Sequence, residues 1–209
     1  MVKAGRGALI LAGGKSKRIG TSKAFIDLNG KPMLLYVVDK AQEIADEIVV
    51  AVEKDSDPSS YVRILPPSIL VVNDFMVNVG PLAGILVGMS NLSAEYGVVL
   101  PCDVPFVNVD VLKLLFDRAS GAEAAIPQWP NGYIEPLHAV YRVESALQAT
   151  RSALKEGKQR VYEMIRRLRG IVYVDVEEIK RIDPNLLTFF NVNSYDDLSR
   201  AKLLLNSCR

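Results

Sequence analysis

The chain has 209 residues, 49% of them apolar, and a formal net charge of +1. A nearly neutral chain has no general electrostatic attraction for nucleic acid or an anionic membrane, so we expect neither as a partner. No apolar run approaches the roughly 18 residues that span a bilayer, and no hydrophobic signal segment opens the chain, so we expect a cytoplasmic protein with a single domain over residues 1–209.

Apolar runs of strand length recur along the chain, at 8–11, 47–52, 69–72, 97–100, 124–127 and 134–141. Most are continuous rather than alternating, which is typical of strands covered on both faces in a parallel sheet. Helical spacing of apolar residues occurs at 32–45, 109–119, 144–154 and 195–205, the last after Ser194, a residue suited to a helix N-cap. The alternation predicts an α/β fold, a three-layer α/β/α sandwich with a mostly parallel, Rossmann-like sheet and a ligand site at the carboxyl ends of its strands.

A glycine-opened, cationic loop follows the first predicted strand. Residues 11–18 read Leu-Ala-Gly-Gly-Lys-Ser-Lys-Arg, and Lys23 follows shortly after. Adjacent glycines leave backbone N–H groups uncovered at a strand end, and such a concavity binds anions. The loop therefore predicts a polyphosphate site; the alternative is a plain strand-to-helix turn with solvated lysines.

Two familiar phosphate-binding motifs do not fit this loop. A P-loop needs a glycine five positions before Gly14, where the chain has Leu9. A dinucleotide fingerprint fails as well, because Gly5 and Gly7 precede the strand and Ile10 occupies the place of the third glycine.

Carboxylates end two of the predicted strands. Asp103 follows the strand 97–100 and lies between Pro101 and Pro105, where it suits Mg²⁺, a hard ion that takes few protein oxygens beside phosphates and waters. A turn-forming or helix-capping role is the alternative. Asp74 follows the strand 69–72 and precedes Gly-Pro-Leu-Ala-Gly at 80–84. Gly80 and Gly84 are candidate nucleotide contacts, although packing of a helix on the sheet would explain Gly84 equally well.

Cysteine and histidine are too scarce for other metal chemistry. Cys102 and Cys208 form neither a disulfide framework nor a CxxC pair, so we expect free thiols. His138, the single histidine, lies in the predicted strand 134–141, and a packed histidine is the favoured interpretation over a catalytic one.

Taken together, four ordered motifs resemble the molybdenum cofactor guanylyltransferases, nucleotidyltransferases of the glycosyltransferase-A-like fold. The motifs are Leu-Ala-Gly-Gly-x-Ser-x-Arg-Ile-Gly at 11–20 with Lys23, Gly-Pro-Leu-Ala-Gly at 80–84, Pro-Cys-Asp-x-Pro at 101–105, and Asn-Val-Asn at 191–193. The resemblance covers residues 7 to 204, and its opening motif is shared by many nucleotidyltransferases.

The resemblance implies transfer of GMP from GTP to the terminal phosphate of molybdopterin, with release of pyrophosphate. GTP and molybdopterin would be the small-molecule partners, Mg²⁺ the cofactor, and enzymes that handle molybdopterin the protein partners. By the same resemblance, the nucleotide would be held by the backbone of Leu11, Ala12, Gly13 and Gly14, the phosphates by Arg18 and Lys23, the nucleoside by Asp74, Mg²⁺ by Asp103, and the acceptor by Asn191, Asn193 and the stretch 158–160 with Arg160. Arg18, Lys23 and Asp103 would be the catalytic residues.

Two positions depart from the family's usual pattern. Ser22 replaces the aspartate that usually precedes the loop lysine, and the strand ending near Ala51 lacks an asparagine that some members carry. Three alternatives therefore stay open: cytidylyl transfer to molybdopterin, guanylyl transfer to cobinamide phosphate or phospholactate, and a non-catalytic GTP-binding sensor or scaffold.

Overall fold

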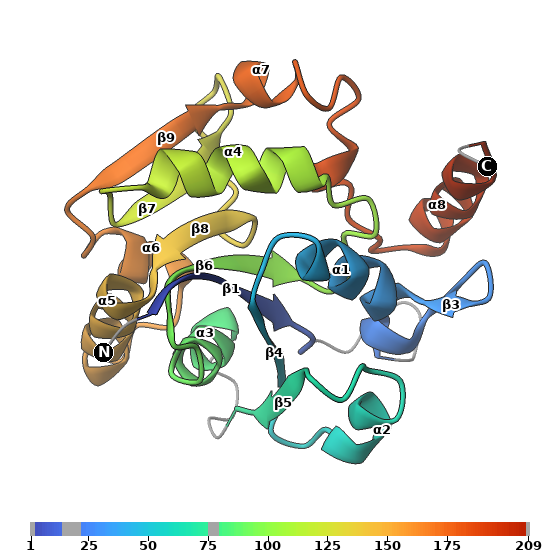
Figure 1. Ribbon diagram of the computed structural model, residues 1–209, viewed down its shortest axis with the longest axis horizontal. Coiled ribbons are helices and arrows are strands. Elements are labelled where there is room, and N and C mark those ends of the chain that lie inside the picture. Colours follow the sequence, from blue (N-terminus) through green and yellow to red (C-terminus); the bar gives the residue numbers. More distant parts are fainter. Residues whose placement is uncertain (1–2, 14–21, 75–79, 208–209) are drawn as a thin grey trace.

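The computed structural model describes residues 3–13, 22–74 and 80–207 (Figure 1). In this part of the chain, seven strands form one sheet in the order β5-β4-β1-β6-β8-β7-β9. Their bounds are Lys3–Leu11 for β1, Glu47–Val52 for β4, Leu70–Asn73 for β5, Ala94–Pro101 for β6, Ala124–Gln128 for β7, Ala139–Arg142 for β8 and Ile171–Asp175 for β9.

The sheet is mostly parallel, as predicted. β1 pairs in parallel with β4 and β6, β4 pairs in parallel with β5, and β7 pairs in parallel with β9, whereas β8 runs antiparallel to both β6 and β7. Because β8 reverses direction between β6 and β7, the carboxyl ends of the other six strands meet at one edge. That edge is where a ligand site is expected in an open α/β sheet.

Helices cover both faces of the sheet, which confirms the three-layer sandwich. Alternate residues of β1 point to opposite faces, so Ile10 packs in one core and Leu9 in the other. The first core is closed by α1 (Met33–Gln42), α2 (Pro58–Val62), α4 (Val109–Ala119) and α7 (Val176–Ile179), and the second by α3 (Pro81–Met89), α5 (Val143–Lys155) and α6 (Val161–Ile165).

A smaller cluster lies outside the sandwich. It joins the two-stranded sheet of β2 (Asp27–Leu28) and β3 (Lys31–Pro32) to α8 (Tyr195–Ser207), which Figure 1 shows beside β3. Ser194 caps α8, as predicted, because its Oγ accepts the Asp197 N–H at 3.2 Å while Asp197 Oδ2 accepts the Ser194 N–H at 2.9 Å. Two short 3₁₀ turns, η1 (Lys23–Phe25) and η2 (Leu187–Phe189), lie near the carboxyl edge.

The predicted strand 134–141 is wrong over its first half. Ile134 makes only an isolated bridge to Gln128, and a turn precedes β8, closed by the His138 N–H, which donates to Glu135 O at 3.1 Å. Pro136 has no N–H for a strand ladder, which favours the turn.

The predicted single domain stays a prediction. Among the described residues no helix is long and apolar enough to cross a membrane.

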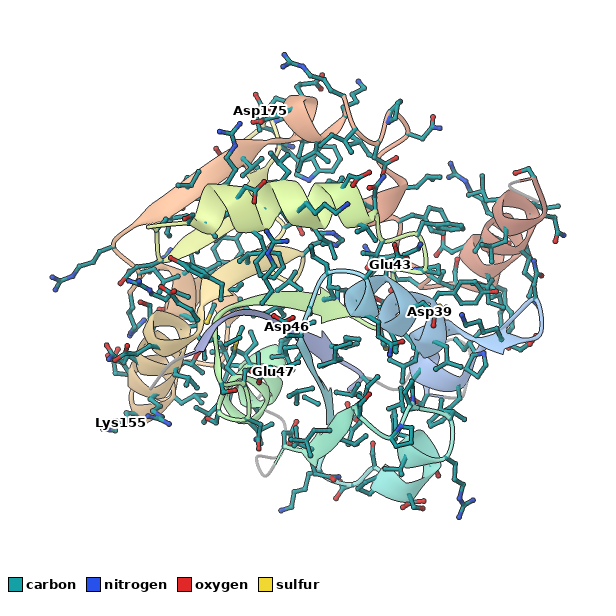
Figure 2. The ribbon with its side chains drawn as sticks, viewed as in Figure 1. Asp39, Glu43, Asp46, Glu47, Lys155 and Asp175 are labelled. Atoms are coloured by element: carbon teal, nitrogen blue, oxygen red, sulfur yellow. The ribbon has the colours of Figure 1, made fainter. Side chains whose placement is uncertain are left out.

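Carboxylates at the amino edge of the sheet have structural partners. Figure 2 labels Asp46 and Glu47 at the start of β4. Asp46 Oδ2 accepts the Arg6 N–H at 3.1 Å, and Glu47 accepts the N–H and hydroxyl of Ser93 at 2.8 and 2.5 Å. These contacts connect loops to the sheet and give both carboxylates a structural role.

Candidate functional site

The end of β1 lies between the ends of β4 and β6. The Ala12 N–H donates to Ala51 O at 2.8 Å, and Leu11 O accepts the Cys102 N–H at 3.1 Å. A Cβ at Gly13 would lie 3.0 Å from Glu53 Cγ, so a side chain there would crowd the residue that follows β4. Leu11, Ala12 and Gly13 are therefore at the carboxyl edge; the predicted site residues Gly14 and Arg18 lie outside the described residues.

Lys23 is the centre of a polar cluster at this edge. Its Nζ donates to Asp103 Oδ2 at 2.6 Å and to Asn193 Oδ1 at 2.5 Å. The side chains of Lys23 and Asp103 are only 19% and 13% exposed, so the ion pair is partly shielded from water. Three residues predicted from separate motifs thus meet at one ammonium group.

Backbone contacts hold the partners of Lys23 in place. The Val192 N–H donates to Asp103 O at 2.9 Å, which attaches the Asn-Val-Asn segment to the end of β6. The Asn193 N–H donates to Asp197 Oδ2 at 3.0 Å, so the first turn of α8 also fixes Asn193. Asn193 was predicted to face the acceptor, yet the contact that the structure records is with Lys23.

Asp103 has the chemistry for one hard cation. Its Oδ1 is buried and, among the described residues, has no hydrogen-bond partner. Burial raises the pKa of the neighbouring Cys102 thiol, which keeps that thiol protonated near neutral pH. No group of three or more His, Cys, Asp or Glu forms a metal cluster in the described part of the chain. Mg²⁺ fits such a site, because it can take one carboxylate and complete its shell with substrate phosphates and water.

The predicted nucleoside-side residues lie next to β5 and α3. The Asp74 N–H donates to Val52 O at 2.9 Å, which places Asp74 directly after β5. Gly80 precedes α3 with φ +67° and ψ −156°, a backbone conformation that is essentially restricted to glycine. A Cβ at Gly84 would lie 2.9 Å from Leu11 Cδ2, so close packing of α3 on β1 accounts for this glycine.

Two predicted acceptor residues stand apart from the Lys23 cluster. Asn191, two residues before Asn193, donates from Nδ2 to Phe189 O at 3.0 Å. Arg160 is exposed and precedes α6, where its carbonyl accepts the Glu163 N–H at 2.9 Å. Among the hydrogen bonds and ion pairs of the described residues, none joins the side chain of Asn191 or Arg160 to Lys23 or Asp103.

His138 is a packed residue, as the sequence favoured. It is 3% exposed, its Nε2 lies 3.1 Å from Thr188 Oγ1, and its ring meets Phe189 at 5.0 Å between centroids. Burial lowers the pKa of His138 to about 3, so the ring is neutral near pH 7. His138 therefore contributes to packing against Thr188 and Phe189.

Tyr61 was missed by the sequence analysis. Its hydroxyl lies 3.2 Å from Ser22 Oγ and 3.4 Å from Ala12 O, and its ring meets Phe25 at 4.7 Å between centroids. The residue belongs to the short helix α2, in a stretch rich in helix breakers that predicts only a loop. No motif signal identifies it, because its contacts depend on tertiary structure.

Comparison with known proteins decides the family. A sequence model of the MobA-like NTP transferase domain matches residues 8–171, most of the chain. The chain belongs to the MobA-like NTP transferases. It is therefore a nucleotidyltransferase, as the four motifs indicate.

Relatives of this MobA-like transferase are similar in sequence along nearly its whole length. A probable molybdenum cofactor guanylyltransferase of Methanosarcina mazei is 35% identical, with 92% of this chain and 88% of that protein aligned. A protein of the same name from Methanocaldococcus jannaschii is 34% identical, with 91% and 95% aligned.

Solved structures of similar proteins have the same fold as this chain. The molybdopterin-guanine dinucleotide biosynthesis protein A of Archaeoglobus fulgidus has a TM-score of 0.81 at 30% identity, covering 96% of this chain and 99% of that one. A 4-diphosphocytidyl-2C-methyl-D-erythritol synthase of Anaerococcus prevotii has a TM-score of 0.71 at 13% identity over 97% and 96%, a likeness of fold alone.

Proposed function

We propose that this MobA-like transferase transfers GMP from GTP to the terminal phosphate of molybdopterin, with release of pyrophosphate and formation of the guanine dinucleotide form of the molybdenum cofactor. The observation that carries the proposal is the cluster of Lys23, Asp103 and Asn193 at the carboxyl edge of the sheet. The names of the archaeal relatives and of the Archaeoglobus structure support the choice of base and acceptor.

The chemistry needs alignment and charge neutralisation rather than a nucleophilic side chain. An oxygen of the acceptor phosphate forms a new bond to the α-phosphorus of GTP, and the bond from that phosphorus to the bridging oxygen breaks, releasing pyrophosphate. The acceptor phosphate is already an anion, so no general base is required. Lys23 would leave its contact with Asp103 to neutralise charge on the phosphates, which is the kind of electrostatic assistance that lowers such barriers.

We assign the divalent ion to Asp103. Its buried Oδ1 would hold Mg²⁺, and Oδ2 would become available once Lys23 turns to the phosphates. When bound, Mg²⁺ supplies charge neutralisation and orientation of phosphate oxygens. A single protein carboxylate is consistent with an ion that enters together with the nucleotide.

The remaining roles are those that the resemblance implies, with one role for Asn193 added from its contact with Lys23. The backbone at Leu11, Ala12 and Gly13 would cradle the nucleotide, with Asp74 and Gly80 on the nucleoside side. Asn191 and Arg160 would bind the acceptor. Asn193 would hold the Lys23 ammonium in position between nucleotide and acceptor through its hydrogen bond. Roles for Gly14 and Arg18 rest on the resemblance, because both lie outside the described residues.

The decisive experiment is pyrophosphate release in the presence of Mg²⁺ and molybdopterin, with GTP, CTP and ATP offered in separate reactions. A parallel set omits the pterin. Release with GTP that requires molybdopterin is the expected result. Release only with CTP would retain the mechanism and overturn the choice of base, and GTP binding without release under all conditions would favour the sensor or scaffold.

A further inference from the structure

We propose that Tyr61 is a positioning residue that holds the turn carrying Lys23 against the end of β1. The inference rests on the proposed function of Lys23 and adds a residue that no motif contains. Tyr61 is 2% exposed and reaches the carboxyl edge from α2. There it contacts Ala12, Ser22 and Phe25.

The Tyr61 hydroxyl lies within hydrogen-bond distance of two residues of the carboxyl edge. It can donate to the carbonyl of Ala12 at 3.4 Å, because a carbonyl oxygen only accepts. The Ser22 hydroxyl lies 3.2 Å from the Tyr61 oxygen, and either oxygen can be the donor in that contact. Tyr61 therefore connects Ser22 to Ala12, two residues that are ten positions apart in the sequence.

The Tyr61 side chain contacts the Lys23 turn on both sides of the lysine, at Ser22 and at Phe25. Ser22 precedes η1 and its carbonyl accepts the Phe25 N–H at 3.1 Å, while the Phe25 ring packs on the Tyr61 ring. Lys23 lies between these two anchored residues. Its backbone is thus located by Tyr61, and its ammonium is located by Asp103 and Asn193.

Hydrogen bonds connect α2, the helix that carries Tyr61, and the loop before it to the sheet. Asp57 caps α2 by accepting the Ser59 N–H at 3.0 Å. Asn73, the last residue of β5, donates from Nδ2 to Glu53 O at 3.1 Å and to Ser56 O at 3.0 Å, which fixes the loop leading into α2. The position of the hydroxyl is therefore set by β4 and β5, independently of any ligand.

The test compares Tyr61→Phe with Tyr96→Phe, which also deletes one hydroxyl. The Tyr96 hydroxyl donates to Ala122 O and accepts the Gly121 N–H, both at 3.1 Å, away from the Lys23 turn. We expect Tyr61→Phe to lower kcat for pyrophosphate release about 3- to 10-fold, the effect of one hydrogen bond, with a smaller change in KM for GTP. Tyr96→Phe should leave kcat unchanged.

A double-variant cycle separates positioning from a general structural role. If Tyr61 acts through Lys23, Tyr61→Phe should cause no further loss of kcat in a Lys23→Ala background. An equal loss in both backgrounds would overturn the inference, as would an unchanged kcat in Tyr61→Phe alone.

A second readout does not depend on catalysis. Acylation of Lys23 by a limiting amine reagent, followed by peptide mass spectrometry, should be at least about threefold faster in Tyr61→Phe than in wild type, and unchanged in Tyr96→Phe. Unchanged labelling in Tyr61→Phe overturns the inference. A wild type that releases no pyrophosphate with any nucleotide refutes the proposed function, and the labelling comparison then decides on Tyr61 alone.

Discussion

Lys23 Nζ donates to Asp103 Oδ2 at 2.6 Å, although 80 positions of sequence separate the two residues. The contact joins the turn after β1 to the end of β6 and neutralises two partly buried charges. Under the proposed function, a phosphate bound by Lys23 would leave the Asp103 carboxylate without its counter-charge, and a divalent ion bound with the phosphate would neutralise that carboxylate again. Nucleotide and metal ion are therefore expected to bind together.

Removal of the Asp103 charge should abolish most of the activity. We expect Asp103→Asn to lower kcat for pyrophosphate release by at least about 10²-fold, the effect of a single catalytic electrostatic contact in other enzymes, and Lys23→Ala to do the same. Asp117→Asn is the matched control, because Asp117 pairs with Arg6 at the amino edge and its side chain is 71% exposed. Near-normal turnover in Asp103→Asn would refute its assignment.

Asn193 should act on turnover through Lys23. Asn193→Ala deletes the Oδ1 acceptor 2.5 Å from Lys23 Nζ, and we expect kcat to fall about 10-fold. Initial rates at saturating GTP and varied acceptor give kcat and the acceptor KM separately. Asn91→Ala, at an exposed position after α3, serves as the control. A change confined to the acceptor KM would return Asn193 to the acceptor-binding role that its motif predicts.

Two glycines of α3 should differ in their tolerance of a methyl group. A Cβ at Gly88 would lie 2.1 Å from Leu9 Cδ1 and 2.8 Å from Leu9 Cδ2, whereas at Gly84 the single close atom is Leu11 Cδ2 at 2.9 Å. We expect Gly88→Ala to lower the free energy of unfolding by about 1–3 kcal/mol, the usual cost of overpacking, and Gly84→Ala by less.

The comparison of these two variants isolates packing from helix propensity, because both positions are within α3 and gain the same preference from alanine. Urea unfolding measures both. Equal stability of the two variants would contradict the close approach of α3 to Leu9.

His138 should make the protein less stable in mild acid. Burial lowers the pKa of His138 to about 3, below its usual value of 6.5. Between these values the unfolded state binds a proton that the native state does not, so the free energy of unfolding falls as the pH drops, by up to about 1.4 kcal/mol per pH unit. Urea unfolding at pH 7.5 and pH 5 should show this loss.

His138→Phe is the control for that loss, since it preserves a ring against Phe189 but has no proton to gain. The difference in unfolding free energy between the two pH values should be about 1–2 kcal/mol smaller in this variant. An equal difference in wild type and variant would assign the acid sensitivity to other groups.

Continuous apolar runs were enough to predict the central sheet, because β1, β4 and β6 are buried on both faces and cannot be confused with half-exposed strands. β9 was not predicted, since this edge strand exposes Val172 and Tyr173 and lacks a buried run. The start of β8 was placed too early, because the apolar run continues through Pro136, whose missing N–H favours a turn.

The candidate site was predictable wherever a residue stands at a strand end with its own motif, as Asp103 does. The hydrogen bond between Lys23 and Asn193 was not predictable, because 170 positions separate the two residues and no local pattern encodes which side-chain amide contacts the lysine. Tyr61 was missed altogether, because it belongs to no motif and its two hydrogen bonds reach 39 and 49 positions along the chain. Such contacts follow from the order of strands in the sheet, which the sequence leaves open.

The link between Val192 and Asp103 has a consequence for how the protein becomes active during synthesis. The Val192 N–H bonds the carbonyl of Asp103, and the neighbouring Asn193 completes the shell of Lys23. A nascent chain that has emerged through Asp103 contains both residues of the ion pair, yet about ninety further residues must emerge before Asn193 can join them, and such distant contacts form late. If the proposed function holds, ribosome-bound intermediates are therefore expected to gain the fold of the central sheet before they gain full turnover, because full turnover requires the docked C-terminal segment.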